Sequence, residues 1–354
     1  MHQSDICIAG GGIIGLSLAL ELHRRGLRVT VLDQAQFLSE ASTAAAGMLA
    51  ASDPENPAPL RKLSNLSLSL YPAFLHRLHE LSGIHVPFHT SQTLQSHHNI
   101  SADTLSPEAL TQILPQLHPG DRHFTLIEEH SLDPRQLATA LLAAVQATTI
   151  DLQPGTQVLS VQSVNEAVEV HTASTVFHAS QFINCTGAWA THSSLAPNLT
   201  VTPKKGQMLA ISLPPSLPLS LVVRTHDIYI VPRTTGSNAG RAIIGATIED
   251  AGFDKAVHPT DIAHLRSRAA ALLPALAKAP QLETWAGLRP ATSDGLPFLG
   301  ALPDRPHQYV AAGHYRNGIL LAAATAHVMA QLVTSETTTI DLVNFSAIRA
   351  KKPQ

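Results

Sequence analysis

The chain has 354 residues, of which 44% are hydrophobic and only 14% are charged, with a formal net charge of −3 at pH 7. A disordered chain would combine low hydrophobicity with high net charge, so this composition predicts a globular protein. Because the chain carries no excess of basic residues, we expect neither a nucleic-acid partner nor an anionic membrane surface. At about 150 residues per domain, the length indicates two domains.

The N-terminal region predicts neither export nor a membrane segment. Residues 6–20 form an apolar run, but glycines interrupt it, no basic residue precedes it, and a spanning helix would be longer. Cys7 and Cys185, the two cysteines, lie in apolar runs and lack the spacing of a disulfide framework or a metal site. We therefore expect a cytoplasmic protein without a transmembrane segment, a disulfide or a metal.

In chain order, the first elements are a strand, a helix and a second strand. Residues 5–9 predict a short buried strand, and residues 16–25 have the apolar spacing of a helix. Gly26 is a fitting residue to end that helix, and residues 28–32 predict the second buried strand. Parallel strands connected in this way are usually covered by helices on both faces, which indicates an α/β fold.

A glycine-rich turn connects the first strand to the helix. Gly10, Gly12 and Gly15 have the spacing Gly-x-Gly-x-x-Gly, and Asp33 follows the second strand. In a dinucleotide site such glycines allow a tight turn and a close approach to the pyrophosphate, while the acid binds the ribose. A glycine cluster in an ordinary loop is the alternative, and the pattern does not distinguish FAD from NAD.

The middle of the chain changes character. Residues 134–145 predict a helix with Asp133 as its N-cap, and residues 158–185 predict a meander of short strands. Residues 229–232 and 242–246 predict strands of a second sheet, and residues 261–276 an amphipathic helix.

The C-terminal part returns to the pattern of the first. Residues 309–312 predict a strand that leads into Gly313, and residues 318–333 predict a long helix rich in Ala and Leu. Because a strand and a helix of this kind lie at each end of the chain, we expect one domain assembled from distant segments, with the second domain inserted.

A run of small residues follows Asp33. Residues 41–49, ASTAAAGML, suit a segment that lies against a bulky cofactor, where large or charged side chains would clash. An alanine-rich helix start is the alternative explanation.

Four segments together resemble the FAD-dependent glycine oxidase and D-amino acid oxidase family, most closely the thiamine-pathway glycine oxidases. They are GGGIIG (10–15), ASTAAAGML (41–49), WAGLRPATSDGLPFLG (285–300) and GHYRNGILLAAA (313–324). Shorter matches at 133–135, 185–189, 203–207 and 229–233 extend the resemblance over nearly the whole chain.

The resemblance implies an FAD-binding Rossmann domain of the glutathione-reductase type with an inserted mixed-sheet α+β substrate domain. On this basis we expect the FAD-binding domain to comprise residues 1–80, 131–200 and 286–354, and the substrate domain residues 81–130 and 201–285. FAD is expected to be noncovalent, because family members that tether it use a late cysteine and none follows Cys185.

The resemblance also implies which residues contact FAD. By position they are Gly10, Gly12, Ile13, Ile14, Gly15, Asp33, Gln34, Ala41, Ser42, Ala46, Gly47, Met48, Val158, Gly187, His314, Tyr315, Arg316, Asn317, Gly318, Ile319 and Leu320. The N-terminus of the helix that starts at Gly318 is expected to face the flavin and to favour its reduction through the helix dipole.

Tyr229, Arg289 and Arg316 match the positions that surround the substrate. Arginine suits an amino-acid carboxylate because its planar fork donates two parallel hydrogen bonds. The apolar neighbours of Arg289 make a merely solvated role unusual. A carbonyl-capping Arg289, a core Tyr229 and an Arg316 that holds the flavin loop are the alternatives.

The implied reaction is the oxidation of glycine, or of another small D- or N-methyl amino acid, by hydride transfer from Cα to flavin N5. The products are the 2-oxo acid, ammonia or an amine, and hydrogen peroxide if molecular oxygen is the electron acceptor, with a role in thiamine biosynthesis. The alternatives are a D-amino acid dehydrogenase that passes electrons to a quinone or carrier, and a non-catalytic flavin-binding protein. A homo-oligomer is one option for its assembly.

The chain departs from the family pattern at two places. The acidic residue that the family carries after the GML segment falls nearest Pro54, between Asp53 and Glu55, which leaves the roles of these acids open. Asp227 stands where many members have a histidine. Both differences weaken the specific expectation of glycine as the substrate.

Overall fold

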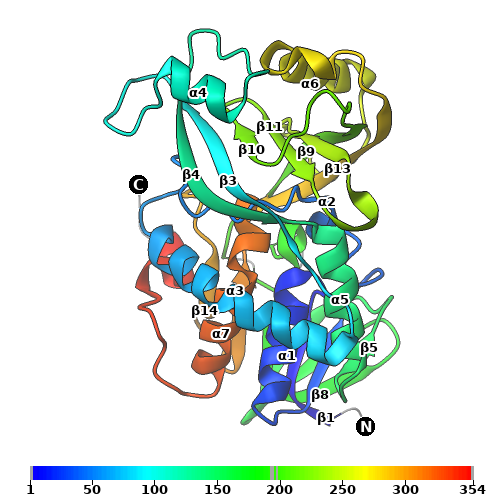
Figure 1. Ribbon diagram of the computed structural model, residues 1–354. Helices are drawn as coiled ribbons and strands as arrows, with labels where there is room; N and C mark the ends of the chain where they lie inside the picture. The colour runs from blue at the N-terminus through cyan, green and yellow to red at the C-terminus, as the bar shows by residue number, and fades with distance from the viewer. Residues whose placement is uncertain (1–2, 192–194, 197, 352–354) are drawn as a thin grey trace.

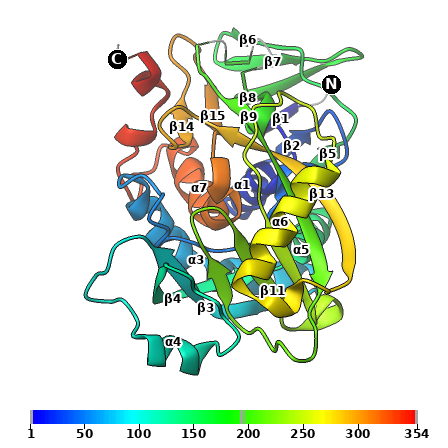
Figure 2. The same ribbon diagram turned by 90° about the horizontal axis from the view of Figure 1, so that it is seen from above.

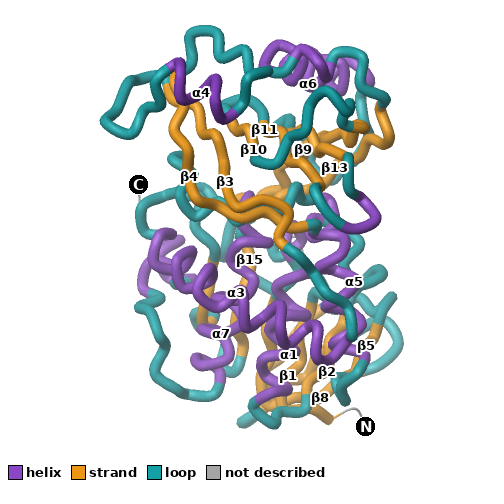
Figure 3. The backbone as a smooth tube through the Cα atoms, in the orientation of Figure 1, coloured by secondary structure: helices purple, strands orange, loops and turns teal. Residues whose placement is uncertain are grey.

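Two β-sheets form the framework of the computed structural model, which describes residues 3–191, 195–196 and 198–351 (Figures 1 and 3). The first sheet has the strand order β14-β15-β8-β1-β2-β5, with β6 and β7 added through β8. Its strands are β1 (Gln3–Ala9), β2 (Val29–Leu32), β5 (Asp151–Gln153), β6 (Ser160–Val164), β7 (Ala167–His171), β8 (Val176–Asn184), β14 (Phe298–Ala301) and β15 (Gln308–Ala312). Strands from both ends of the chain therefore share one sheet, as the sequence predicts.

Four long helices lie on one side of this sheet, and the second of them along the chain packs across the two that follow it (Figure 1). They are α1 (Ile13–Arg24), α3 (Leu60–Ser82), α5 (Pro134–Gln146) and α7 (Gly318–Val333). Strand β1 alternates between the two faces: Ile6 and Ile8 pack against these helices, whereas Cys7 packs with β7 residues such as Val168. The second face is thus covered by the antiparallel strands β6 and β7, not by the helices that the βαβ pattern led us to expect there.

The second sheet has the strand order β13-β9-β12-β11-β10-β3-β4. Its strands are β3 (Phe88–His97), β4 (His123–Leu132), β9 (Thr202–Ser212), β10 (Val222–Arg224), β11 (Tyr229–Arg233), β12 (Arg241–Gly245) and β13 (Gln281–Ala291). Figures 1 and 2 show α4 (Pro107–Ile113) and α6 (Pro259–Leu272) on its outer side, and the short helix α2 (Ala41–Ala44) lies between the two sheets.

Alternation along the strands of the second sheet gives it two different faces. Leu209, Ile230 and Ile244 point into the apolar core under α4 and α6. Their neighbours Met208 and Tyr229 point to the opposite face and line a cavity between the two sheets. The outer face of the second sheet packs into the apolar core under α4 and α6. Candidate functional side chains such as Tyr229 therefore lie on the inner face, between the two sheets.

Several elements predicted from the sequence are confirmed, and the structure also contains helices and strands that were not predicted. Helix α7 has the predicted bounds, and Asp133 caps α5 by accepting a hydrogen bond from the Arg135 N–H at 2.9 Å. The helix expected over 261–276 ends earlier, as α6 followed by a 3-10 turn. Helix α3 and the long strands β3, β4, β9 and β13 were not predicted from the sequence.

The division into domains remains a proposal. The predicted boundaries at 130/131 and 285/286 fall inside β4 and β13, both of which belong to the second sheet. Residues 1–2, 192–194, 197 and 352–354 of the predicted FAD-binding segments lie outside the described residues.

Candidate active site

Two adjoining cavities lie where the sheets meet. We name each by one charged residue of its lining: the Arg289 cavity, of about 1200 Å³, and the Asp33 cavity, of about 940 Å³, both volumes including space open to solvent. Both are lined by Gly12, Ala41, Ser42, Cys185, Gly187 and Pro290. The shared lining makes them one elongated crevice that crosses the start of α1.

The Asp33 cavity is formed by the ends of parallel strands. Asp33 follows β2, and its carboxylate accepts hydrogen bonds from the N–H groups of Gly11 at 2.7 Å and Ala35 at 2.8 Å. Burial raises the pKa of Asp33 above its ordinary value, against the opposing effect of these two amides. Gln34 and Val158 line the same cavity. This is the arrangement by which an acid at the end of the second strand receives a ribose.

The glycine turn and the small-residue segment meet at the centre of the crevice. Gly10 has a φ of +101°, which favours glycine, and it leads the chain from β1 into α1. The N–H of Ile13, at the start of α1, donates to the Ser42 hydroxyl at 2.9 Å. Gly47 also has a positive φ, of +87°, and a Cβ there would collide with the Leu132 carbonyl. The backbone at Gly47 therefore packs closely against the end of β4, and residues 44–48 line the Arg289 cavity.

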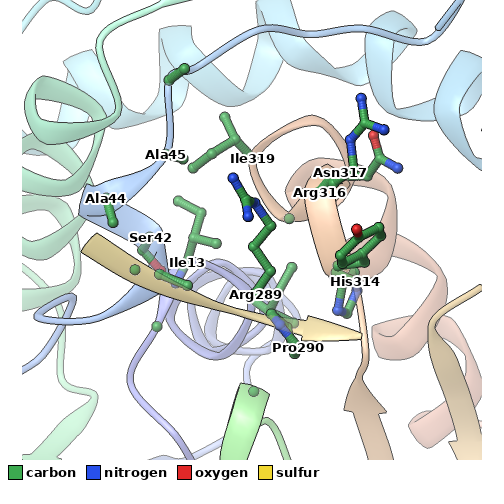
Figure 4. A pocket seen from close by; sticks show the side chains of 18 of the residues that line it. Ile13, Ser42, Ala44, Ala45, Arg289, Pro290, His314, Arg316, Asn317 and Ile319 are labelled. Atoms are coloured by element: carbon green, nitrogen blue, oxygen red, sulfur yellow. The ribbon is translucent and has the colours of Figure 1, made fainter. Parts of the chain in front are cut away.

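Arg289 and Tyr229 lie at the far end of the Arg289 cavity. Arg289 is on β13 and projects into the cavity (Figure 4), and Tyr229 is on β11, two strands beyond the adjacent β9. Both side chains lie over glycines: a Cβ at Gly206 would collide with the Arg289 guanidinium, and one at Gly245 with the Tyr229 ring. Cross-strand glycines thus provide the space in which these two large side chains converge.

The electrostatics of this end favour an anion. Among the described residues, Arg289 has no carboxylate within 4.0 Å, and its Nη1 donates to the Thr247 carbonyl at 3.1 Å. Burial raises the pKa of the Tyr229 hydroxyl, although the nearby Arg289 opposes this. Tyr229 is therefore a neutral donor at physiological pH, beside a guanidinium that no carboxylate of the described residues neutralises.

The segment after β15 forms another wall of the Arg289 cavity. His314 is buried, its Nε2 lies 3.0 Å from the Thr325 hydroxyl, and burial lowers its pKa to about 3. This imidazole is therefore neutral near pH 7. Asn317 bonds to the side chain of Asn56 at 2.9 Å, which joins the wall to the loop before α3.

Arg316 contacts the acids whose roles the sequence left open. Its Nη2 lies 2.8 Å from Asp53, and its Nη1 contacts Glu55. Asp53 itself lines the Arg289 cavity. Asp227 does not line that cavity; it contacts Thr225 at 2.7 Å and lies 3.7 Å from Arg268.

Most of the residues expected to hold FAD or substrate do line the crevice. The exceptions are Gly15, where a Cβ would collide with the Gly10 carbonyl, and Leu320, which is 1% exposed in the core. The crevice also contains residues that were not assigned to it from the sequence, among them Ala50, Met208, Gly287, Ala311 and Ala312 at one end and Thr156, Gln157 and Trp189 at the other. Ala44 and Ala45 line it as well, and they belong to the small-residue segment that the sequence placed against a cofactor.

The shape and lining of the crevice fit FAD. The acid Asp33 lies at one end, backbone N–H groups and small residues lie at the centre, and a mainly apolar cavity that contains Arg289 lies at the other end. A family model described as FAD dependent oxidoreductase matches residues 5–332. The chain belongs to this FAD-dependent oxidoreductase family.

Similar proteins support the same assignment. The chain is 36% identical to the bifunctional protein ThiO/ThiG of Nostoc sp. over 98% of its own length, although it spans only 55% of that protein. It is 33% identical to the glycine oxidase of Geobacillus kaustophilus, covering 98% of this chain and 97% of the relative. The crystal structure of the glycine oxidase from that organism superposes with a TM-score of 0.90 at 32% identity, covering 98% of each chain.

Family membership confirms three predictions from the sequence: the resemblance itself, the mixed α/β fold, and FAD as the cofactor. Within the described residues, no helix is long and apolar enough to cross a membrane. Those residues also contain no group of three or more His, Cys, Asp or Glu placed to hold a metal ion.

Proposed function

We propose that this flavoprotein oxidises glycine, or another small D- or N-methyl amino acid, to the 2-oxo acid with release of ammonia or an amine. The relatives named glycine oxidase and ThiO/ThiG support this substrate class and a role in thiamine biosynthesis. One observation carries the proposal for this chain: the Arg289 guanidinium lies in the same cavity as the predicted flavin-binding segments.

Arg289 is the group that binds the substrate carboxylate. One of its nitrogens is held by the Thr247 carbonyl, and this contact leaves the remaining N–H groups to pair with a carboxylate in the cavity. Tyr229, which stays protonated because burial raises its pKa, adds a neutral donor. Met48 and Met208 line the same cavity and favour a substrate with a small side chain.

The chain's own residues bind and orient the substrate. When bound, FAD supplies the chemistry of hydride acceptance from the substrate Cα. Arg289 and Tyr229 fix the carboxylate, and with it the direction of the Cα–H bond. His314 is neutral and bonded to Thr325, so it places no cation in the wall. The amine has to lose its extra proton first, and we assign no side chain to that step.

The residues that would hold FAD divide along the crevice. Asp33, Gln34 and Val158 line the cavity at one end and would hold the adenosine part. Residues 44–48 and 314–319 line the other cavity and would hold the isoalloxazine ring. Both cysteines are free and buried, and none follows Cys185, which supports noncovalent binding and a reducing, cytoplasmic compartment.

Molecular oxygen is the proposed electron acceptor, so that each oxidised substrate yields one hydrogen peroxide. The test is anaerobic mixing of the flavoprotein with glycine, sarcosine and D-alanine, followed by peroxide detection in air. We expect at least one of them to bleach the oxidised flavin band and to give stoichiometric peroxide. Bleaching without peroxide but with reduction of a quinone would establish a dehydrogenase instead. Absence of bleaching by all three would refute this substrate class.

A further inference from the structure

Strand β9 carries two fully buried polar side chains on the face that does not line the Arg289 cavity. Lys205 and Gln207 are both 0% exposed. Burial of a lysine removes its ammonium from water, which is costly unless partners compensate the charge. Lys205 and Gln207 belong to the segment PKKGQ, which resembles the family pattern. The proposed reaction gives this segment no role.

Both side chains contact one residue, Glu249: Lys205 through an ion pair and Gln207 through a hydrogen bond. Lys205 Nζ lies 3.1 Å from the Glu249 carboxylate, and the two backbones exchange N–H···O bonds of 3.0 Å in each direction. Gln207 donates from Nε2 to Glu249 at 2.8 Å and to Asp261 of α6 at 2.7 Å. The loop that follows β12 is therefore fastened to β9 by charge and by hydrogen bonds.

The fastened loop presents the carbonyl that Arg289 contacts. The Gln207 backbone N–H donates to the Thr247 hydroxyl at 2.8 Å, and the Thr247 N–H donates to the Gln207 carbonyl at 3.3 Å. The Thr247 hydroxyl in turn donates to Glu249. The Thr247 carbonyl then accepts from Arg289 Nη1 at 3.1 Å. A continuous set of contacts thus runs from the buried lysine to the guanidinium.

Gly206 lies between Lys205 and Gln207 and faces the opposite way. Arg289 lies across it, in space that a Cβ at Gly206 would fill. Successive side chains of a strand point to opposite faces, so one tripeptide supports Arg289 from both faces of the sheet. The glycine gives it room, and its two neighbours hold the loop that fixes one of its nitrogens.

We propose that Lys205 and Gln207 are positioning residues for Arg289, which through Glu249 and Thr247 aim its free N–H groups at the substrate carboxylate. This inference rests on the proposed role of Arg289 as the carboxylate-binding group. It predicts that loss of Lys205 weakens carboxylate binding without a corresponding loss of turnover at saturation.

The experiment uses the FAD-loaded protein with Lys205→Met, Lys205→Arg and Thr247→Val. Lys278→Met serves as a matched control, since that lysine is exposed in a turn after α6. The dissociation constant of acetate is measured from the change in flavin absorbance, next to KM and kcat for the best amino acid, FAD content and melting temperature. We expect Lys205→Met to raise the acetate dissociation constant and KM about tenfold, with kcat within about twofold of the parent. Lys205→Arg should restore most of the affinity, Thr247→Val should lose about threefold, and Lys278→Met should match the parent.

Two results would overturn the inference. One is a Lys205→Met protein with lower melting temperature or FAD content but unchanged acetate affinity, since that outcome assigns the lysine to stability alone. If Lys205→Met does not fold, unchanged acetate affinity in Thr247→Val decides against it equally. Arg289→Leu, measured in parallel, distinguishes failure of this inference from failure of the proposed function. If Arg289→Leu retains acetate affinity, the proposed role of Arg289 in carboxylate binding is itself wrong. If it loses affinity, Lys205→Met should add little in its background, because the two act as a unit.

Discussion

The guanidinium of Arg316 lies 2.8 Å from the carboxylate of Asp53, across 263 positions of sequence. This ion pair, extended by Glu55, joins the wall after β15 to the loop that precedes α3. Asp53 also lies 4.0 Å from the buried Arg224, so the acid is held from two sides. A guanidinium engaged in this way is less available to a substrate carboxylate than that of Arg289.

The first prediction concerns Arg316. Replacement by Met should release the loop and raise the dissociation constant of FAD about tenfold, because the charge-assisted contacts with Asp53 and Glu55 are lost at a partly exposed site. KM for the amino acid should change much less. The checks are fluorescence titration of the apoprotein with FAD and steady-state kinetics, with Arg61→Met, an exposed arginine at the start of α3, as control. A large rise in KM with normal FAD affinity would assign Arg316 to the substrate instead.

The second prediction concerns Arg289 and Tyr229. Arg289→Leu removes the charged fork, and we expect kcat/KM to fall by roughly 100-fold or more, the equivalent of two hydrogen bonds to a charged group. Tyr229→Phe removes one hydroxyl and should cost about three- to tenfold. Steady-state kinetics with intact FAD content provide the measurement. Arg289→Leu, but not Tyr229→Phe, should lose the preference for amines that carry a carboxylate. An unchanged preference in Arg289→Leu would contradict the assignment of Arg289 as the carboxylate-binding group.

The third prediction concerns the space over Gly206. Gly206→Ala introduces a Cβ that collides with the Arg289 guanidinium, and displacing it should lower kcat/KM roughly tenfold, as overpacking of a filled site typically costs 1–3 kcal/mol. Gly26→Ala is the matched control. Gly26 has a φ of +83° with no heavy atom within 4 Å of the added Cβ, so it should lose about 1–2 kcal/mol of stability and no affinity. Normal KM in Gly206→Ala would show that the guanidinium has room to move.

The fourth prediction concerns acid stability. Burial lowers the pKa of His314 to about 3 and, together with Arg233, that of His89 to about 4. In the unfolded chain both titrate near 6.5, so between these values the unfolded state binds more protons. The stabilisation is complete above about pH 6.5 and is lost as the pH falls toward the folded values, by at most about 1.4 kcal/mol per pH unit for each group.

Urea unfolding between pH 7 and pH 4.5 tests the direction of this pH dependence. The free energy of unfolding should decrease as the pH falls, and His314→Gln should make that dependence shallower because one depressed histidine is removed. A dependence as steep as in the parent protein would mean that His314 titrates normally in the folded state.

The fifth prediction concerns the first residue of α7. A Cβ at Gly318 would meet only the Cβ of His314, at 3.9 Å, so side chains fit there. Gly318→Asp places a negative charge at the helix N-terminus and should lower the flavin midpoint potential by on the order of 20 mV, about 1 kcal/mol for two electrons. Gly318→Ala adds the same Cβ without charge and should leave the potential unchanged. Spectroelectrochemical titration distinguishes the two variants. Equal midpoint potentials in Gly318→Asp and Gly318→Ala would show that the helix dipole does not influence flavin reduction.

Local patterns in the sequence were sufficient for parts of the fold. The glycine turn between β1 and α1, the Asp133 cap of α5 and the bounds of α7 depend on residues close together in the chain. Strands β9 and β13 were missed because glycines and polar or charged residues interrupt their apolar pattern. Those interruptions are the places where Gly206, Lys205 and Arg289 form the site.

The sequence by itself determined the family, the cofactor and the small set of residues from which the crevice is built, because each rests on a short motif. Only the tertiary structure decided which charges meet. It paired Arg316 with Asp53, left Arg289 without a carboxylate from any residue that the structure describes, and placed Lys205 under the loop that Arg289 contacts. Such pairings depend on which strands are neighbours in the sheet and on which face each side chain points to, and no spacing along the chain encodes that.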